Sequence, residues 1–176
     1  MGKPVRHIPV KLIIGLFSSH PDCFSAATRI LKNKFGKTDS ETSFWDFSCT
    51  AYYEKEFGKN LKRKFLSFGK LIAPSQLYKL KLYTNRIENK FSEKSARKIN
   101  IDPGYVSLTQ LVLFTTKNRS HRIYCDEGIY ADIELAFVEN SFRALEMTYP
   151  DYRDEKCIDF FNSVRKKYFS QVACYL

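Results

Sequence analysis

The most regular pattern in the chain is an alternation of apolar and polar positions in its C-terminal third. Apolar residues occupy every second position of Ile129–Phe137, which is the period of a strand with one buried face. Two shorter segments flank it, Arg122–Cys125 before and Phe142–Thr148 after, each across a short turn-forming link. The pattern predicts an antiparallel meander of three strands.

Longer apolar patterns predict one buried strand and three helices. Pro9–Phe17 is a nearly continuous apolar run, which is typical of a strand buried on both faces. Apolar residues then recur at helical spacing over 24–35, and Gly36 is placed to end that helix. Pro74–Glu93 and Asp154–Val172 show the same helical periodicity, and the acidic start of the second suits the helix dipole.

Weaker patterns fill the remaining segments. They predict strands over Thr42–Phe47, Leu61–Phe68 and Arg97–Ile101 and a short helix over Tyr52–Phe57. Asp102-Pro103-Gly104 has turn chemistry and is expected to close the last of these strands. Ser107-Leu108-Thr109-Gln110 has the spacing of a capping box, which predicts a short helix continuing to Thr116.

The order of these elements indicates the fold class. The first hundred residues read β-α-β-β-α-β, the order of a ferredoxin-like unit, and the rest reads as a helix, the meander and a C-terminal helix. We therefore predict an α+β fold. The length of 176 residues fits a single domain over 1–176. The alternative is a subdivision into 1–104 and 105–176.

Charge adds a first functional hypothesis. The chain carries 29 Lys and Arg against 19 Asp and Glu, a net charge of +10, and its 44% hydrophobic content excludes a disordered chain. Lys55–Lys98 alone holds 13 basic and 3 acidic residues, interleaved with aromatic residues. Basic groups neutralise phosphates and aromatic faces stack on bases, so this segment predicts binding of RNA or another polyanion. The plainer alternative is a solvated basic face. The ligand-binding residues expected here are Lys62, Arg63, Lys81, Asn85 and Arg86.

Polar clusters in the second half suggest a different function. Asp102, His121 and Asp151 are candidate catalytic acids and bases, because carboxyl and imidazole groups transfer protons near neutral pH. Candidate ligand-binding residues beside them are Lys117, Arg122, Arg153, Tyr105 and Tyr149. They predict an enzyme acting on a small molecule or nucleotide, with a phosphorylated compound as one expected ligand. Ordinary turns are the structural alternative. A third hypothesis is a non-catalytic scaffold or homo-oligomer, since 11 Tyr and 15 Phe could cover an interface as well as a core.

Several motifs are missing from the sequence. The three histidines have no metal-ligand spacing, and neither a P-loop nor a G-x-G-x-x-G loop occurs, so we expect no metal and no cofactor. The five cysteines form no C-x-x-C pair, which favours buried free thiols in a reducing cytoplasm. No apolar run is long enough to span a bilayer, so no membrane association is predicted.

Short motifs spread along most of the chain carry a family resemblance. They are Lys11–Leu16, Phe44–Phe47, Tyr52-Tyr53, Arg63–Phe68, Lys81, Thr84-Asn85, Ile99–Tyr105, Thr115–Lys117, His121–Tyr124, Gly128–Ala131 and Thr148–Arg153. On these residues the chain resembles a bacterial family called domain of unknown function 4416. The resemblance implies a compact, single-domain, cytosolic bacterial protein. Because that family is uncharacterised, it assigns no catalytic residue.

Overall fold

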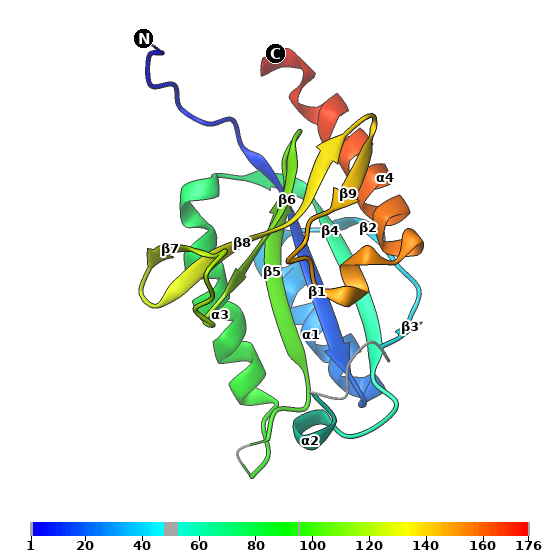
Figure 1. Ribbon diagram of the computed structural model, residues 1–176. Helices are drawn as coiled ribbons and strands as arrows, with labels where there is room; N and C mark the ends of the chain where they lie inside the picture. Colours follow the sequence, from blue (N-terminus) through cyan, green and yellow to red (C-terminus); the bar gives the residue numbers. More distant parts are fainter. Residues whose placement is uncertain (1, 48–52, 95, 176) are drawn as a thin grey trace.

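The computed structural model describes residues 2–47, 53–94 and 96–175, and this part of the chain contains one antiparallel sheet of nine strands (Figure 1). The strand order is β2-β4-β1-β5-β6-β8-β7, while β3 also pairs with β4 and β9 with β8. The strands are β1 (Val10–Ser18), β2 (Thr38–Glu41), β3 (Trp45–Asp46), β4 (Lys62–Ile72), β5 (Asn100–Val106), β6 (Gln110–Thr115), β7 (Ile123–Asp126), β8 (Ile129–Val138) and β9 (Ser141–Ala144). The helices are α1 (Pro21–Phe35), the short α2 (Glu54–Phe57), α3 (Leu77–Lys90) and α4 (Glu155–Val172).

The sheet is covered by helices on both faces. All nine residues of β1 are buried, as expected for a central strand. Its apolar even-numbered residues, such as Leu12, belong to the core that includes Leu31 of α1 and Ile87 of α3. Ile13, on the opposite face, belongs to a second core that includes Phe161 of α4. The candidate site described below lies on this α4 face.

The strongly periodic predictions are confirmed. The buried first strand, the three long helices and the three-strand meander of β7, β8 and β9 all occur near the expected bounds. Asp154 caps α4, because its carboxylate accepts a hydrogen bond from the backbone N–H of Lys156 at 2.8 Å. The coarse prediction of an α+β protein is therefore correct, and its sheet is entirely antiparallel in the described part of the chain.

The helix predicted from Ser107 to Thr116 is wrong, because this segment forms β6. The Ser107 hydroxyl does accept backbone hydrogen bonds, from Thr109 at 3.2 Å and from Gln110 at 3.0 Å. These bonds close the turn between β5 and β6 instead of starting a helix. Serine makes the same local contacts in turns and at helix N-termini, so the capping-box spacing did not distinguish the two. The next residues are apolar and buried on both sides of the sheet.

The turn predicted at Asp102-Pro103-Gly104 is also wrong, since these residues lie inside β5. Two features make a strand possible. The N–H of Ile101 points away from β1, to the Glu88 carboxylate, and position 103 has the same orientation two residues later. A proline there removes no hydrogen bond to β1, and pairing with β6 begins only at Gly104. A Cβ on Gly104 would lie 2.3 Å from the Val112 carbonyl oxygen, so only glycine allows this close approach of β6.

The structure also differs from the predictions in the bounds of some strands and in the burial of two cysteines. The strand expected over Thr42–Phe47 is replaced by the separate β2 and β3, and β4 continues to Ile72. Tyr52 of the predicted short helix and Cys49 lie outside the described residues. The described cysteines are free thiols: Cys23 and Cys157 are buried, whereas Cys125 and Cys174 are exposed, so the expectation of burial is wrong for the last two. Among the described residues, no helix is long and apolar enough to cross a membrane.

Candidate functional site

A small polar cavity of about 60 Å³ lies on the α4 face of the sheet, against β1, β4, β5, β6 and β8. Its charged lining residues are Arg63, Asp102, Arg122, Asp132, Glu134 and Asp151. Its uncharged polar lining residues are Tyr53, Asn100, Thr115, Tyr149 and Tyr152. Six ionisable groups around so small a space are unusual for a protein interior, where charges are normally paired or absent.

Strand register places the charged groups around Gly15. This residue of β1 lies opposite Phe65 of β4 and Asp102 of β5. A Cβ at position 15 would lie 3.0 Å from Nη2 of Arg63 and 3.2 Å from the hydroxyl oxygen of Tyr152. The absence of a side chain at Gly15 therefore leaves the space into which the Arg63 guanidinium fits.

Arg63 is a buried cation surrounded by aromatic rings. Its side chain is 4% exposed, and its guanidinium carbon lies 4.6 to 5.8 Å from the ring centroids of Phe65, Tyr152, Phe47 and Phe17. Nη2 donates a hydrogen bond to the Tyr152 hydroxyl at 2.7 Å and lies 3.2 Å from Oδ2 of Asp151. Although burial opposes the charge, Tyr152 and Asp151 raise the pKa of Arg63, so the guanidinium stays charged.

Two buried atoms of this ion pair make no hydrogen bond. Among the described residues, neither Nε of Arg63 nor Oδ2 of Asp151 has a hydrogen-bond partner. Buried polar atoms are nearly always hydrogen-bonded, and an exception often marks a functional site or a position for a bound molecule. Both atoms belong to residues that line the cavity.

Glu134 is an acid held in its neutral form. It is 1% exposed, and its Oε2 accepts a hydrogen bond from the backbone N–H of Tyr149 at 2.9 Å. Burial raises the pKa of Glu134 to about 8, and the charges of Asp132 and Asp151 add to this effect. Glu134 is therefore mainly protonated at neutral pH, and the protonated carboxyl can donate a hydrogen bond or a proton.

Asp102 is in the opposite protonation state. Its Oδ1 accepts a hydrogen bond from Nζ of Lys81 at 3.0 Å, and its Oδ2 accepts one from Nδ2 of Asn100 at 2.6 Å. Burial opposes ionisation, but the charges of Lys81 and Arg63 together with these hydrogen bonds lower the pKa of Asp102. Burial raises the pKa of Asp151, and the Arg63 charge counteracts it. The cavity thus holds carboxyl groups whose environments separate their pKa values.

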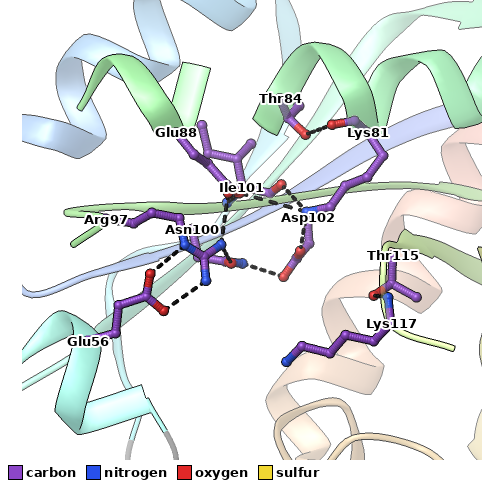
Figure 2. Close-up of polar contacts among 10 residues, drawn as sticks. All are labelled: Glu56, Lys81, Thr84, Glu88, Arg97, Asn100, Ile101, Asp102, Thr115 and Lys117. Atoms are coloured by element: carbon purple, nitrogen blue, oxygen red, sulfur yellow. Dashed lines mark hydrogen bonds and ion pairs between the residues drawn. The ribbon is translucent and has the colours of Figure 1, made fainter. Parts of the chain in front are cut away.

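Lys81 and Glu88 connect α3 to the cavity (Figure 2). Both side chains are buried, and both bond the backbone of Ile101, which lies where β5 has not yet paired with β6. Oε1 of Glu88 accepts from the Ile101 N–H at 2.6 Å, and Nζ of Lys81 donates to the Ile101 carbonyl at 3.1 Å. The two side chains thus form the hydrogen bonds that a neighbouring strand would form, so the N–H and the carbonyl of Ile101 both have partners. The same Nζ also fixes Asp102.

Arg97 extends this network to α2 (Figure 2). Its guanidinium bonds both carboxylate oxygens of Glu56, at 2.6 and 2.9 Å. Its Nη1 also donates to Oε2 of Glu88 at 2.9 Å and to Oδ1 of Asn100 at 3.1 Å. Asn100 in turn bonds Asp102, so side chains from α2, α3, β5 and the segment before β5 together hold one carboxylate of the cavity in position.

Arg122 and His121 approach the cavity from the loop before β7. Nε of Arg122 donates to Oδ2 of Asp132 at 2.6 Å, and its Nη1 donates to the Lys117 carbonyl at 2.9 Å. Nε2 of His121 lies 3.5 Å from Oδ1 of Asp132, and its side chain is 26% exposed. His121 therefore reaches the site through Asp132. Among the described residues, no group of His, Cys, Asp and Glu side chains is arranged to hold a metal ion.

The structure brings together only part of the predicted site. Asp102, Asp151, Arg122, Tyr149 and Arg63 line the cavity. Lys81 reaches the cavity through Asp102, and His121 reaches it through Asp132. Nζ of Lys117 lies over the ring of Tyr53, which lines the cavity, at 5.4 Å from the ring centroid.

The other predicted residues lie elsewhere. Arg153 donates to the backbone carbonyls of Leu145, Glu146 and Thr148, which fixes the loop before α4. Tyr105 belongs to the core on the opposite face of the sheet, and the exposed Lys62 pairs with Asp46 at 2.5 Å. Asn85 and Arg86 belong to α3 and are not among the residues that line the cavity.

Sequence reasoning missed Asp132 and Glu134. Both occupy polar positions of the alternating β8 segment, to which no function was assigned from the sequence, and both are buried. The two-residue period places both side chains on one face of the strand. It does not show whether other parts of the protein cover that face. Sequence reasoning also missed Asn100 and Tyr53, although both belong to motifs of the family resemblance, Ile99–Tyr105 and Tyr52-Tyr53.

The basic segment 55–98 does not form one exposed surface. Its members Lys62, Arg63, Lys64, Lys81, Arg97 and Lys98 all form ion pairs with acidic side chains. Two of them, Arg63 and Lys81, are buried. Lys79, Arg86 and Lys90 of α3 are exposed. Binding of RNA or another polyanion stays a prediction, to be tested by the salt dependence of affinity.

Comparison with known proteins gives one match. No curated protein and no solved structure matches the chain significantly. The model of a family described as "Domain of unknown function (DUF4416)" matches residues 8–168, which include every charged residue that lines the cavity. The chain belongs to this family.

Proposed function

We propose that this protein is an enzyme that carries out general acid–base chemistry on a small molecule bound at the cavity. The observation that carries the proposal is the placement of two carboxyl groups on the walls of one cavity: Glu134, whose pKa burial raises to about 8, and Asp151, whose Oδ2 is ion-paired with Arg63 but has no hydrogen bond within the described part of the chain. Pairs of carboxyl groups whose environments separate their pKa values are typical of acid–base sites.

Each group has a role that follows from its surroundings. Glu134 donates a proton, because its pKa of about 8 keeps it protonated and ready to release the proton near neutral pH. Asp151 accepts a proton on Oδ2, and the Arg63 guanidinium 3.2 Å away fixes the position of that oxygen. Asp102, held by Lys81 and Asn100, is a positioning residue that supplies a constant negative charge.

An adjoining groove provides the space for a ligand. This groove has a volume of about 570 Å³ and shares Phe47, Arg63 and Asp151 with the cavity. Its volume is in the range of ordinary small-molecule sites, roughly 300–1,000 Å³, whereas the cavity of about 60 Å³ admits only a few atoms. The body of the ligand therefore occupies the groove, and its reacting end meets Arg63 and Asp151.

We also propose that the first part of the chain is a ferredoxin-like unit. The strand order β2-β4-β1-β5, with α1 and α3 packed in the same core, supports this relation. The strands β6 to β9 and α4 then extend the sheet and cover the face that carries the cavity.

Loss of turnover in Glu134→Gln tests the proposed function. We expect the wild-type chain to convert at least one compound in a mixture of small metabolites followed by mass spectrometry. Glu134→Gln and Asp151→Asn should each slow that conversion by about 100-fold or more, because each removes one proton-transfer group. Glu139→Gln, which changes an acid with an 83% exposed side chain, is the matched control and should retain the wild-type rate.

Two results would contradict the proposal: a wild-type chain that converts nothing in the mixture, or full activity in both site variants. Circular dichroism of each variant shows whether it has folded, so that a loss of turnover is assigned to chemistry.

A further inference from the structure

We propose that the ligand of this site is an uncharged planar heterocycle of the nucleobase class, with its ring against the aromatic groove and an amide-type edge on Arg63 and Asp151. This inference rests on the proposed function and names its substrate class.

Four of the eleven residues that line the groove are aromatic, namely Phe44, Trp45, Phe47 and Phe65. Phe47 and Phe65 are buried, so the ring surface open to a ligand belongs to Phe44 and Trp45. Phe44 is 54% exposed although it is a large apolar residue, and its ring packs edge-to-face on Phe24 with centroids 4.9 Å apart. Nζ of Lys64 lies over the ring, 5.4 Å from its centroid, and the rest of the ring is exposed. Flat aromatic rings suit a flat ligand, since every base presents a π-face for stacking.

The charged side chains around the cavity, at the inner end of the groove, already form ion pairs with one another. Arg63 is paired with Asp151, Arg122 with Asp132, and Lys81 with Asp102. The remaining acid, Glu134, is mainly neutral at neutral pH. A phosphate, carboxylate or ammonium group that entered would bring a buried charge with no counter-charge, which is costly. The part of the ligand that meets these side chains is therefore uncharged.

Two buried atoms of the ion pair between Arg63 and Asp151 have no hydrogen-bond partner among the residues that the structure describes, and the edge of the ligand is the one that would satisfy both. Nε of Arg63 is a hydrogen-bond donor, and Oδ2 of Asp151 is an acceptor. They belong to one ion pair, whose Nη2 and Oδ2 lie 3.2 Å apart. A ligand pairs with this donor and this acceptor when its edge carries an acceptor next to a donor. A ring amide and an aminopyrimidine both have such an edge. Uracil, cytosine, guanine and adenine all carry such an edge.

The chain contains its own reporter for this site. Trp45 is the sole tryptophan of the sequence, and it lines the groove. Its fluorescence should change when a ring binds beside it. We therefore titrate the full chain with each of the four free bases and with their ribonucleosides. Inorganic phosphate and spermidine serve as charged probes.

We expect at least one base or nucleoside to produce a saturable change in Trp45 fluorescence, and neither charged probe to do so. Phe44→Ala should weaken that binding by about five-fold or more, the range found when an aromatic side chain that stacks on a base is removed. Phe169→Ala is the matched control. Phe169 is similarly exposed, at 49%, but lies on α4 away from the groove, so its variant should bind within about two-fold of wild type.

Three results would overturn the inference: no response to any base or nucleoside, a response to phosphate or spermidine, or equal binding by Phe44→Ala and wild type. None of them decides the proposed function, because the turnover experiment uses neither Trp45 nor these probes. A metabolite of another class converted by wild type and not by Glu134→Gln would overturn the substrate class alone.

Discussion

Replacing Glu134 by glutamine is expected to change how the stability of the protein depends on pH, by about 4 kcal/mol between pH 5 and pH 9. In the folded state burial raises the pKa of Glu134 from 4.5 to about 8. Between these two values the folded protein binds a proton that the unfolded chain has released. The free energy of unfolding therefore falls as pH rises through this window. A pKa difference of this size corresponds to a change of about 4–5 kcal/mol in the free energy of unfolding.

Glutamine keeps the shape of the side chain and can still accept the hydrogen bond from the Tyr149 N–H, but it does not titrate. The stability of Glu134→Gln relative to wild type should therefore be lowest at pH 5 and increase toward pH 9. The groups that face Glu134 and affect its pKa are Asp132, Asp151 and Arg122. Their own titration is common to both proteins and is largely removed by taking the difference.

Urea unfolding of both proteins at pH 5, 7 and 9 measures this effect. The exposed Glu139→Gln variant controls for the removal of any carboxyl group and should follow the wild-type curve. Parallel stability curves for wild type and Glu134→Gln would show that Glu134 ionises as easily as a carboxyl on the surface, and the account of the site would be wrong.

Replacing Lys81 by methionine is expected to destabilise the protein by about 3–5 kcal/mol. The ammonium is buried, lies 3.0 Å from Oδ1 of Asp102 and 3.7 Å from Oε1 of Glu88, and bonds the Ile101 carbonyl. Methionine fills a similar volume but leaves the buried Glu88 carboxylate and the partly buried Asp102 carboxylate without this cation, and one backbone carbonyl without this donor. The loss of a single partner from a buried network costs far more than the loss of a surface pair.

Lys79→Met is the matched control, because Lys79 is exposed on the same helix two residues away and should cost less than about 0.5 kcal/mol. The free energies of unfolding of both variants are compared with wild type in urea. The Lys81 charge also lowers the pKa of Asp102, so that pKa should rise in Lys81→Met. A Lys81→Met variant as stable as Lys79→Met would show that the network in Figure 2 does not hold α3 to β5.

Long periodic patterns predicted the fold well because they report burial directly. The apolar run of β1 and the stripes of α1, α3 and α4 each extend over nine or more residues. The alternation of β8 predicted the strand but not its burial, because the polar residues Asp132 and Glu134 are buried as well. The errors fall at Asp102–Gly104 and Ser107–Thr116, where the signal was turn or cap chemistry. A serine or a Pro-Gly pair makes favourable local contacts in several backbone conformations, and only the neighbouring strands decide which one occurs.

The site was predictable only in part, for a similar reason. Asp102, Asp151 and Arg122 were found because polar residues of catalytic type cluster near one another in the sequence. Glu134 was missed because the alternation of β8 predicts a strand without showing that its polar positions are buried, and the segment before α4 that bonds it lies 15 residues further along the chain. Lys81 was predicted as a ligand-binding residue of a basic surface, whereas it is buried and fixes Asp102.

The central claim is that Glu134 is a neutral acid at neutral pH on the wall of this cavity. It is tested most directly by titrating the side-chain carboxyl resonances of the carbon-13-labelled protein by NMR, with Glu134→Gln used to assign the signal. We predict that the Glu134 carboxyl titrates near pH 8, far above its ordinary value of 4.5. A Glu134 resonance that titrates near pH 4.5 would contradict both the acid assignment and the function proposed from it.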